Sequence, residues 1–241
     1  MSNHQHFGRS WLLASMAKPA DIERAACAGA DVVVLDLVEF VAQKDQALAR
    51  ESVRAAVAAV HDEGARAFVQ TTPANSAADL RASVWPGLSG VVLSRVESAQ
   101  QVRDVNSDLI ALEKERGLPE RSVALVVSLE TARGNQDAYE IITASPRVRG
   151  ATLGRADLVM DLRPEPSGDL HLMPYLMQRL IIIARAADVT PLGAWWRAPD
   201  RGLLSTPGNT LQAARRGRAA GFKGALCLRA DQVEPLNKIY A

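Results

Sequence analysis

Eight short apolar runs rich in branched side chains recur along the chain, and a segment of helical periodicity separates most neighbouring runs. The runs cover residues 11–14, 31–36, 67–71, 90–93, 123–128, 150–153, 190–194 and 224–228. Strands that alternate with helices form a parallel sheet, because the connection between parallel strands is long enough to hold a helix. This spacing excludes a sheet built from hairpins.

The helical segments carry apolar stripes and recognisable end signals. One helix is expected over residues 98–116, where apolar residues recur at steps of three and four before Gly117 and Pro119. A second, over residues 47–62, is expected to bury Leu48, Val53, Val57 and Val60. Asn209 or Thr210 is expected to cap the last long helix, which ends at Gly221.

Eight strand–helix repeats in 241 residues match a (β/α)8 barrel, which typically needs about 250 residues. We therefore predict an α/β protein with a (β/α)8 TIM barrel as a single domain over residues 1–241, in which residues 1–8 form a flexible tail. A doubly wound open sheet is the main alternative. Such a sheet would show a G-x-G-x-x-G turn after the first strand, whereas residues 14–19 read Ala-Ser-Met-Ala-Lys-Pro.

Charge and composition limit the kinds of molecule that this chain is expected to bind and the compartment in which it is expected to lie. The chain has 28 basic and 27 acidic residues and no long block of like charge, which argues against a nucleic-acid partner. Cys27 and Cys227 lie in apolar surroundings outside any C-x-x-C pair, so both are expected to be reduced and buried. The apolar runs are much shorter than the roughly 20 residues that span a bilayer. With no secretory signal in the sequence, we expect no membrane segment and a cytoplasmic protein.

Polar side chains follow the predicted strands, at the end where such barrels carry their functional groups. They are Asp36 and Glu39, Gln70, Arg95, Glu130, Arg155 and Asp157, and Arg229. Several carboxylates at one rim repel each other unless a cation lies between them, and oxygen ligands without His or Cys suit Mg2+. A single carboxylate in such a place more often caps the next helix, so the metal hypothesis depends on several carboxylates coinciding.

Six motifs occur in one order along nearly the whole chain. They are RSWLL at 9–13, GADVVVLDL at 29–37, RVES at 95–98, LETA at 129–132, LG with DL within 153–158, and AGFKG at 220–224. Together they resemble the citrate lyase beta-subunit-like family, part of the HpcH/HpaI aldolase group in the phosphoenolpyruvate/pyruvate-binding TIM-barrel superfamily.

The resemblance implies a reaction and a metal. Proteins of this family split or form the carbon–carbon bond of 3-hydroxy acyl thioesters, giving an oxo acid and an acetyl thioester. Their Mg2+ lies on a glutamate after strand five and an aspartate after strand six, which match Glu130 and Asp157. The resemblance thus implies Mg2+ or Mn2+, a coenzyme A thioester as a possible substrate, and a homo-oligomer that is a trimer or a multiple of one.

The chain departs from the family pattern where substrate is bound. Gln70 stands in place of an arginine, Arg95 in place of a lysine, and Val38-Glu39 in place of a Glu-Asp pair. A neutral amide cannot form the charge-assisted bidentate pair with a carboxylate. We assign catalytic roles to Asp36 and Glu39, metal binding to Glu130 and Asp157, and substrate binding to Gln70, Arg95, Arg155 and Arg229.

Two classes of function stay open. The first is a Mg2+-dependent lyase or aldolase that acts on a 3-hydroxy acyl thioester or a related hydroxy acid, and the retained carboxylates favour it. The alternative is a catalytically degenerate member that binds a metabolite or a partner protein without turnover, and the loss of the arginine at position 70 favours it. A pyruvate aldolase has less support, because such barrels use a histidine after an acidic pair and Phe40 follows Glu39 here.

Overall fold

The computed structural model describes residues 7–163, 173–194 and 206–241. In these ranges eight parallel strands close into a barrel in chain order, and β8 pairs back to β1. The strands are β1 (Ser10–Ser15), β2 (Val32–Asp36), β3 (Arg66–Thr71), β4 (Leu88–Leu93), β5 (Ala124–Leu129), β6 (Val148–Leu153), β7 (Thr190–Ala194) and β8 (Gly224–Cys227). Each predicted apolar run forms a strand, so the predicted (β/α)8 barrel is confirmed.

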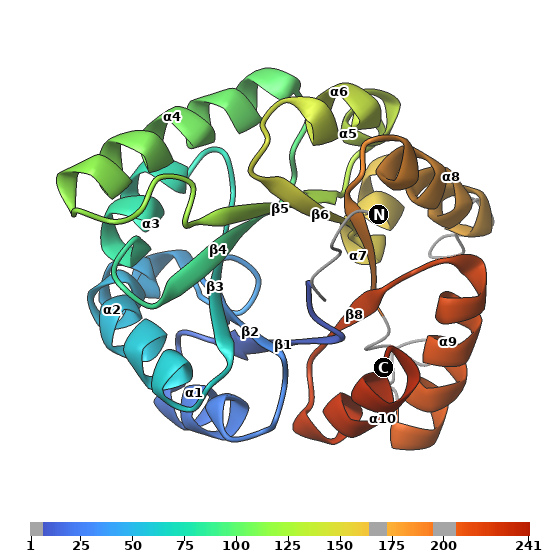
Figure 1. Ribbon diagram of the computed structural model, residues 1–241, viewed down its shortest axis with the longest axis horizontal. Helices are drawn as coiled ribbons and strands as arrows, with labels where there is room; N and C mark the ends of the chain where they lie inside the picture. The colour runs from blue at the N-terminus through green and yellow to red at the C-terminus, as the bar shows by residue number, and fades with distance from the viewer. Residues whose placement is uncertain (1–6, 164–172, 195–205) are drawn as a thin grey trace.

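Helices form a ring outside the strands (Figure 1). They are α1 (Pro19–Ala26), α2 (Gln46–Asp62), α3 (Ser76–Ser83), α4 (Ala99–Glu115), α5 (Ala132–Gln136), α6 (Ala138–Thr143), α7 (Arg155–Leu162), α8 (Met173–Ala186), α9 (Pro207–Ala220) and α10 (Val233–Ile239). Within the described ranges, no helix combines the length and the apolar character needed to cross a membrane.

Alternate residues of a strand point to opposite faces, and this alternation divides the apolar side chains into two clusters. The cluster inside the barrel contains Trp11, Leu13, Val32, Val34, Phe68, Val92, Val126, Leu192 and Leu226. Residues at the intervening positions, such as Leu12, Val33 and Val69, pack with the helices. Phe7 also packs on Trp11, with ring centroids 5.2 Å apart, so the structure places this residue of the predicted tail against the barrel.

The inward positions change from apolar to polar toward the carboxyl ends of the strands. Continuing the same alternation by one step reaches a set of buried residues that we call the polar layer: Ser15, Asp36, Gln70, Ser94, Ser128 and Thr152. The apolar cluster fills the lower part of the barrel, so the polar layer forms a floor beneath its mouth. The polar residues thus lie at the carboxyl ends of the strands, where (β/α)8 enzymes have their active sites.

Three local predictions are wrong. Leu48 is 68% exposed, because it lies one position beside the buried face that begins at Ala49. Cys27 is exposed because it follows the last turn of α1, whereas Cys227 is buried. The cap of α9 is Thr206, whose hydroxyl accepts the backbone N–H of Asn209 at 3.2 Å, because Pro207 takes the first helical position.

Candidate metal-binding site at the barrel mouth

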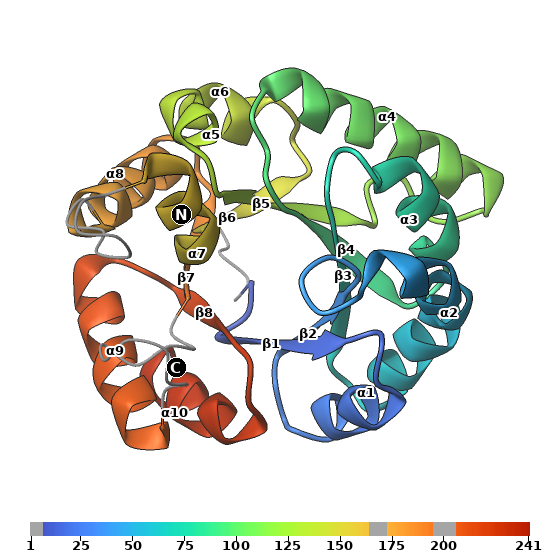
Figure 2. The ribbon, with the colours of Figure 1, turned by 180° about the vertical axis from the view of Figure 1, so that it is seen from behind.

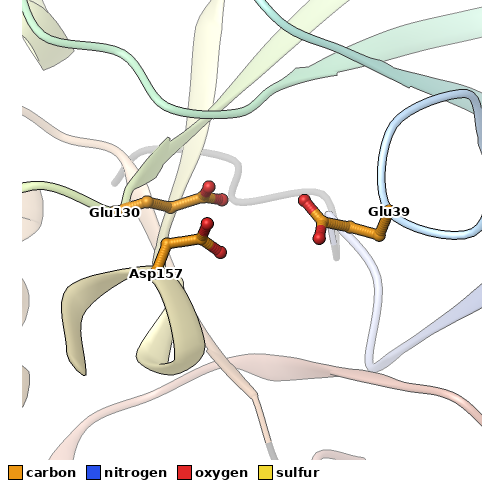
Figure 3. Close-up of side chains that lie close together, drawn as sticks. All are labelled: Glu39, Glu130 and Asp157. Carbon is orange, nitrogen blue, oxygen red and sulfur yellow. The ribbon is translucent and has the colours of Figure 1, made fainter. Parts of the chain in front are cut away.

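Three carboxylates meet at the mouth of the barrel. Glu39, Glu130 and Asp157 each offer one oxygen, and these oxygens lie within 4.8 Å of one another. We call these three residues the carboxylate cluster. Glu130 and Asp157 lie side by side, and Glu39 points at them from the opposite side (Figure 3). The three residues come from distant parts of the chain, so barrel closure brings them together.

Three different elements carry these side chains. Glu39 lies in the loop after β2, Glu130 follows β5, and Asp157 lies in the first turn of α7. In both ribbon views α7 lies closer to the centre of the barrel than α8 does (Figures 1 and 2). Asp157, in the first turn of α7, lies beside Glu130 (Figure 3).

Glu130 is the most buried member of the carboxylate cluster. Only 5% of the residue is exposed, and its Oε2 makes no hydrogen bond within the described part of the chain. Burial raises the pKa of Glu130 to about 7, and the charges of Asp157 and Glu39 add to this effect. A buried polar oxygen without a hydrogen bond is costly, and a bound cation would remove that cost.

Gly154 makes room for Glu130. A Cβ at position 154 would lie 2.4 Å from Cγ and 2.8 Å from Cδ of Glu130, much closer than atoms can approach. Only a glycine allows the Glu130 side chain to lie against the backbone that leads into α7 and Asp157. The glycine between β6 and α7 is thus required by the geometry of the carboxylate cluster.

Asp36 organises the loop that carries Glu39. Its carboxylate accepts the backbone N–H groups of Val38 at 3.0 Å, Glu39 at 3.0 Å and Phe40 at 2.7 Å. Burial raises the pKa of Asp36, while these three N–H groups oppose the rise. The structure therefore places one predicted catalytic residue, Glu39, in the carboxylate cluster, and the other, Asp36, in the turn that supports it.

Arg95 lies among the three carboxylates. Its Nη2 is 3.0 Å from Asp157 Oδ1 and 3.4 Å from Glu39 Oε1, and its Nε is 3.7 Å from Glu130 Oε2. Burial raises the pKa of Glu39 and the charge of Asp157 adds to the rise, whereas Arg95 opposes it. The predicted substrate-binding Arg95 is thus in contact with the predicted metal ligands.

Gln70 lies in the polar layer. Its amide Nε2 donates to the hydroxyl of Ser94 at 2.9 Å, while its Oε1 has no partner among the described residues. The hydroxyl of Thr152, in the same layer, also lacks one. Neither Thr152 nor Ser128 was predicted from the sequence, although continuing the inward alternation of β5 and β6 by one step indicates both.

Of the two remaining predicted arginines, the structure describes the side chain of Arg229 alone. Arg229 pairs with Asp231 and lines a cavity of about 370 Å3, which α1 and the segment after β8 enclose together. Arg155 begins α7, and its side chain lies outside the described residues. Trp195 and Trp196, two other residues after a predicted strand, also lie outside them.

The fold and the site define a (β/α)8 barrel with an acidic, candidate metal-binding mouth. A family model described as HpcH/HpaI aldolase/citrate lyase matches residues 9–230. The chain belongs to that family, which confirms the resemblance found in the sequence motifs. The family to which the chain belongs is therefore a family of lyases of the aldolase and citrate lyase type.

Individual relatives agree with this assignment. The chain is 27% identical to the citrate lyase subunit beta of Escherichia coli K12, over 97% of this chain and 76% of that one. It is 29% identical to a citrate lyase subunit beta-like protein of Mycobacterium tuberculosis H37Rv, over 97% and 79%. The solved citrate lyase beta subunit of M. tuberculosis with oxaloacetate and magnesium has the same fold, with a TM-score of 0.71, 23% identity and coverage of 97% and 96%.

Proposed function

We propose that this protein is a Mg2+-dependent carbon–carbon lyase or aldolase. Its substrate would be a 3-hydroxy acyl thioester or a related hydroxy acid, and its products an oxo acid and an enolate-derived fragment. The observation that carries the proposal is the carboxylate cluster, with the buried Glu130 oxygen that makes no hydrogen bond to any residue of the described ranges. Membership of a lyase family and a similar fold solved with magnesium and oxaloacetate support it.

The residues of the carboxylate cluster fit a divalent cation. All donors are carboxylate oxygens, as Mg2+ and Mn2+ prefer, and Glu130 Oε2 is buried without a hydrogen bond to any described residue. We assign Glu130 and Asp157 as the residues that hold the metal. When bound, the metal would supply Lewis-acid polarisation of an oxo-acid oxygen.

Glu39 is the better placed of the two predicted catalytic groups. Its carboxylate faces Glu130 and Asp157 (Figure 3), whereas the oxygens of Asp36 accept three backbone N–H groups. Burial raises the pKa of Glu39, which makes a carboxylate a stronger base. In cleavage, Glu39 would take the proton of the substrate hydroxyl, and in condensation it would return that proton.

The cavity beside α1 is a candidate place for the carrier of a thioester. Arg24 and Arg229 line it together with Leu12, Leu13 and Leu228, and each arginine is paired with a carboxylate that also lines the cavity, Asp21 and Asp231 respectively. Arginine forks bind phosphate groups well. We propose that a coenzyme A carrier would lie here, with its phosphate groups taking the place of these two carboxylates as partners of the arginines.

A direct assay tests the function. The protein is incubated with Mg2+, acetyl-coenzyme A and glyoxylate, pyruvate or oxaloacetate, and the thioester products are identified by mass spectrometry. We expect a 3-hydroxy acyl thioester with at least one oxo acid, and no product when EDTA is added or Asp157 is changed to Asn. Magnesium binding without any product would instead favour the degenerate, non-catalytic alternative.

Gln70 is expected to determine which oxo acid is accepted. A substrate carboxylate would lack a cationic partner at this position, so the wild type should have weak or no activity on malyl or citryl thioesters. Gln70→Arg should raise that turnover about tenfold or more, the effect of a charge-assisted hydrogen bond worth ~1.5–3 kcal/mol. Gln70→Leu, of similar size, serves as the control. If Gln70→Arg binds Mg2+ but stays inert, the non-catalytic alternative is the better one.

Magnesium affinity is expected to depend on pH. The pKa of Glu130 is about 7 in the metal-free protein, and a proton on this carboxyl competes with the metal. Affinity should level off above that pH and fall by about tenfold for each unit below it, because one bound proton must leave. Calorimetric titrations with Mg2+ at a series of pH values measure this dependence, and an affinity that does not change with pH would contradict it.

We also propose that the chain forms a homo-oligomer, a trimer or a multiple of one, as its family resemblance implies. Light scattering on the purified protein at micromolar concentrations should give a mass of at least three chains. A mass that stays near the 25.9 kDa of one chain would contradict this prediction.

A further inference from the structure

Arg95 contacts the oxygens that a divalent cation would need. One guanidinium group reaches an oxygen of each of the three carboxylates, at distances from 3.0 to 3.7 Å. We propose that Arg95 is a built-in counter-ion of the carboxylate cluster, which the metal displaces when it binds. This inference rests on the metal site of the proposed function. It adds that Arg95 sets the affinity of this site for the metal.

Charge explains why a counter-ion is needed. Three carboxylates with oxygens within 4.8 Å of one another repel each other strongly. Among the described residues, Arg95 is the basic side chain that forms ion pairs with them. Without metal, the guanidinium therefore stabilises the carboxylate cluster, and it does so more weakly than a dication would because it carries a single charge.

The Arg95 side chain is free to leave while its backbone is held. The side chain is 46% exposed, compared with 6% for that of Glu130. The next residue, Val96, is fully buried, and its carbonyl oxygen approaches α5 so closely that a Cβ at Gly134 would lie 2.2 Å away. Arg95 itself has a φ of +55°, a strained conformation for a residue other than glycine. The backbone thus directs the side chain toward the carboxylate cluster.

Metal and guanidinium cannot share these oxygens. Mg2+ binds its ligands at about 2.0–2.1 Å, and a cation placed there would lie against the guanidinium and repel it. Binding of the metal should therefore turn Arg95 away from the carboxylates. Its donors, released from the carboxylates, would then be free to bind the carboxylate of an oxo acid at the barrel mouth, so metal binding would prepare an anion site.

Calorimetry with Mg2+ on Arg95 variants tests the displacement. We expect Arg95→Gln to bind Mg2+ about tenfold or more tighter than the wild type. A charge at this distance changes the pKa of a neighbouring group by about 1–3, which is at least tenfold in proton affinity, and the effect on a bound cation should be of similar size. Arg95→Lys keeps the charge and should stay close to the wild type. Arg103→Gln, which removes an exposed arginine side chain of α4 that donates to Gln100, is the matched control and should not change the affinity.

Two further measurements distinguish the proposed displacement of Arg95 from a folding defect in the variant. In EDTA, Arg95→Gln should melt at a lower temperature than the wild type, and added Mg2+ should raise its Tm by more. In the wild type, the Arg95 Nε–H signal in the nitrogen-15 spectrum, identified by its absence from Arg95→Lys, should shift during the Mg2+ titration with the same Kd. If that signal does not move, the proposed displacement is wrong.

Oxalate, a stable analogue of an oxo-acid enolate, separates the two roles of Arg95. With saturating Mg2+, Arg95→Gln should bind oxalate more weakly, although it binds Mg2+ more tightly. Equal or weaker Mg2+ binding by Arg95→Gln would overturn the counter-ion proposal while leaving the metal site intact. Absence of Mg2+ binding by both proteins would overturn the metal site itself, and the displacement with it.

Discussion

Glu130→Gln is expected to weaken Mg2+ binding by about 100-fold or more. Outer residues that merely support metal ligands cost 10–100-fold when they are changed, so loss of a direct charged ligand should reach at least the upper end of that range. Glutamine has nearly the same shape as the glutamate, so the 2.4 Å restriction at Gly154 is respected. The measurement is a calorimetric titration with Mg2+ of the wild type and the variant.

Stability measurements make this prediction more specific. Glu130 is buried and its pKa is raised to about 7, so its charge opposes folding in the metal-free protein at neutral pH. Without metal, Glu130→Gln should therefore melt at the same temperature as the wild type or higher, yet gain nothing when Mg2+ is added. Glu140→Gln, an exposed glutamate on α6, is the control. Equal Mg2+ affinity in the wild type and in Glu130→Gln would contradict the proposed metal site.

Glu113→Ala is expected to destabilise the protein by about 3–5 kcal/mol, the cost of removing one partner of a buried ion pair. Glu113 lies in α4 and Arg147 precedes β6, and both side chains are nearly inaccessible, at 3% and 1% exposed. Two hydrogen bonds join them, at 2.6 and 2.7 Å. The variant would leave the Arg147 charge buried without its carboxylate. Denaturant unfolding measures the loss, and Glu115→Ala, on an exposed position of the same helix, should change stability by less than about 0.5 kcal/mol.

The pH dependence of this ion pair follows from its pKa shift. Burial raises the pKa of Glu113, but hydrogen bonds from Arg147 and from the backbone of Val123 and Arg121 outweigh burial and bring the pKa below its usual value. A lowered carboxyl pKa contributes stability above the unfolded value of about 4.3, and this is lost as the pH falls through the folded value. The difference in unfolding free energy between wild type and Glu113→Gln should therefore shrink below about pH 4. A difference that persists in acid would show that the Glu113 charge is unimportant.

Replacing both partners gives a second check on the same pair. Glu113→Leu combined with Arg147→Met removes both charges and fills similar volume, and such replacements are often neutral or stabilising. We expect the double variant to recover most of the stability that Glu113→Ala loses. If it is as unstable as Glu113→Ala, the cost lies in packing or in the hydrogen bonds of Arg147 to Asn106 and Val123, and the buried unpaired charge is not its cause.

The sequence by itself predicted the barrel and two of the carboxylates that the structure brings together at its mouth. The eight strands were found because branched apolar runs and helical stripes are local patterns, and closure follows from their number and spacing. Glu130 directly follows β5 and Asp157 lies in the first turn of α7, just after β6. Both were predicted to lie close together because the carboxyl ends of parallel strands meet at one rim. It was harder to predict which helix residues are buried, since Leu48 is exposed although it lies only one residue from the buried face of α2.

The tertiary structure decided how these groups are used. Asp36 and Glu39 both follow β2, but only the folded loop shows that Asp36 accepts its backbone N–H groups while Glu39 faces Glu130 and Asp157. Arg95 is 35 residues before Glu130 in the chain and has a left-handed backbone, and only the folded barrel brings its side chain among the carboxylates. The physical reason is that periodicity identifies the elements, whereas side-chain directions in the loops arise only when the closed barrel brings distant strand ends into contact.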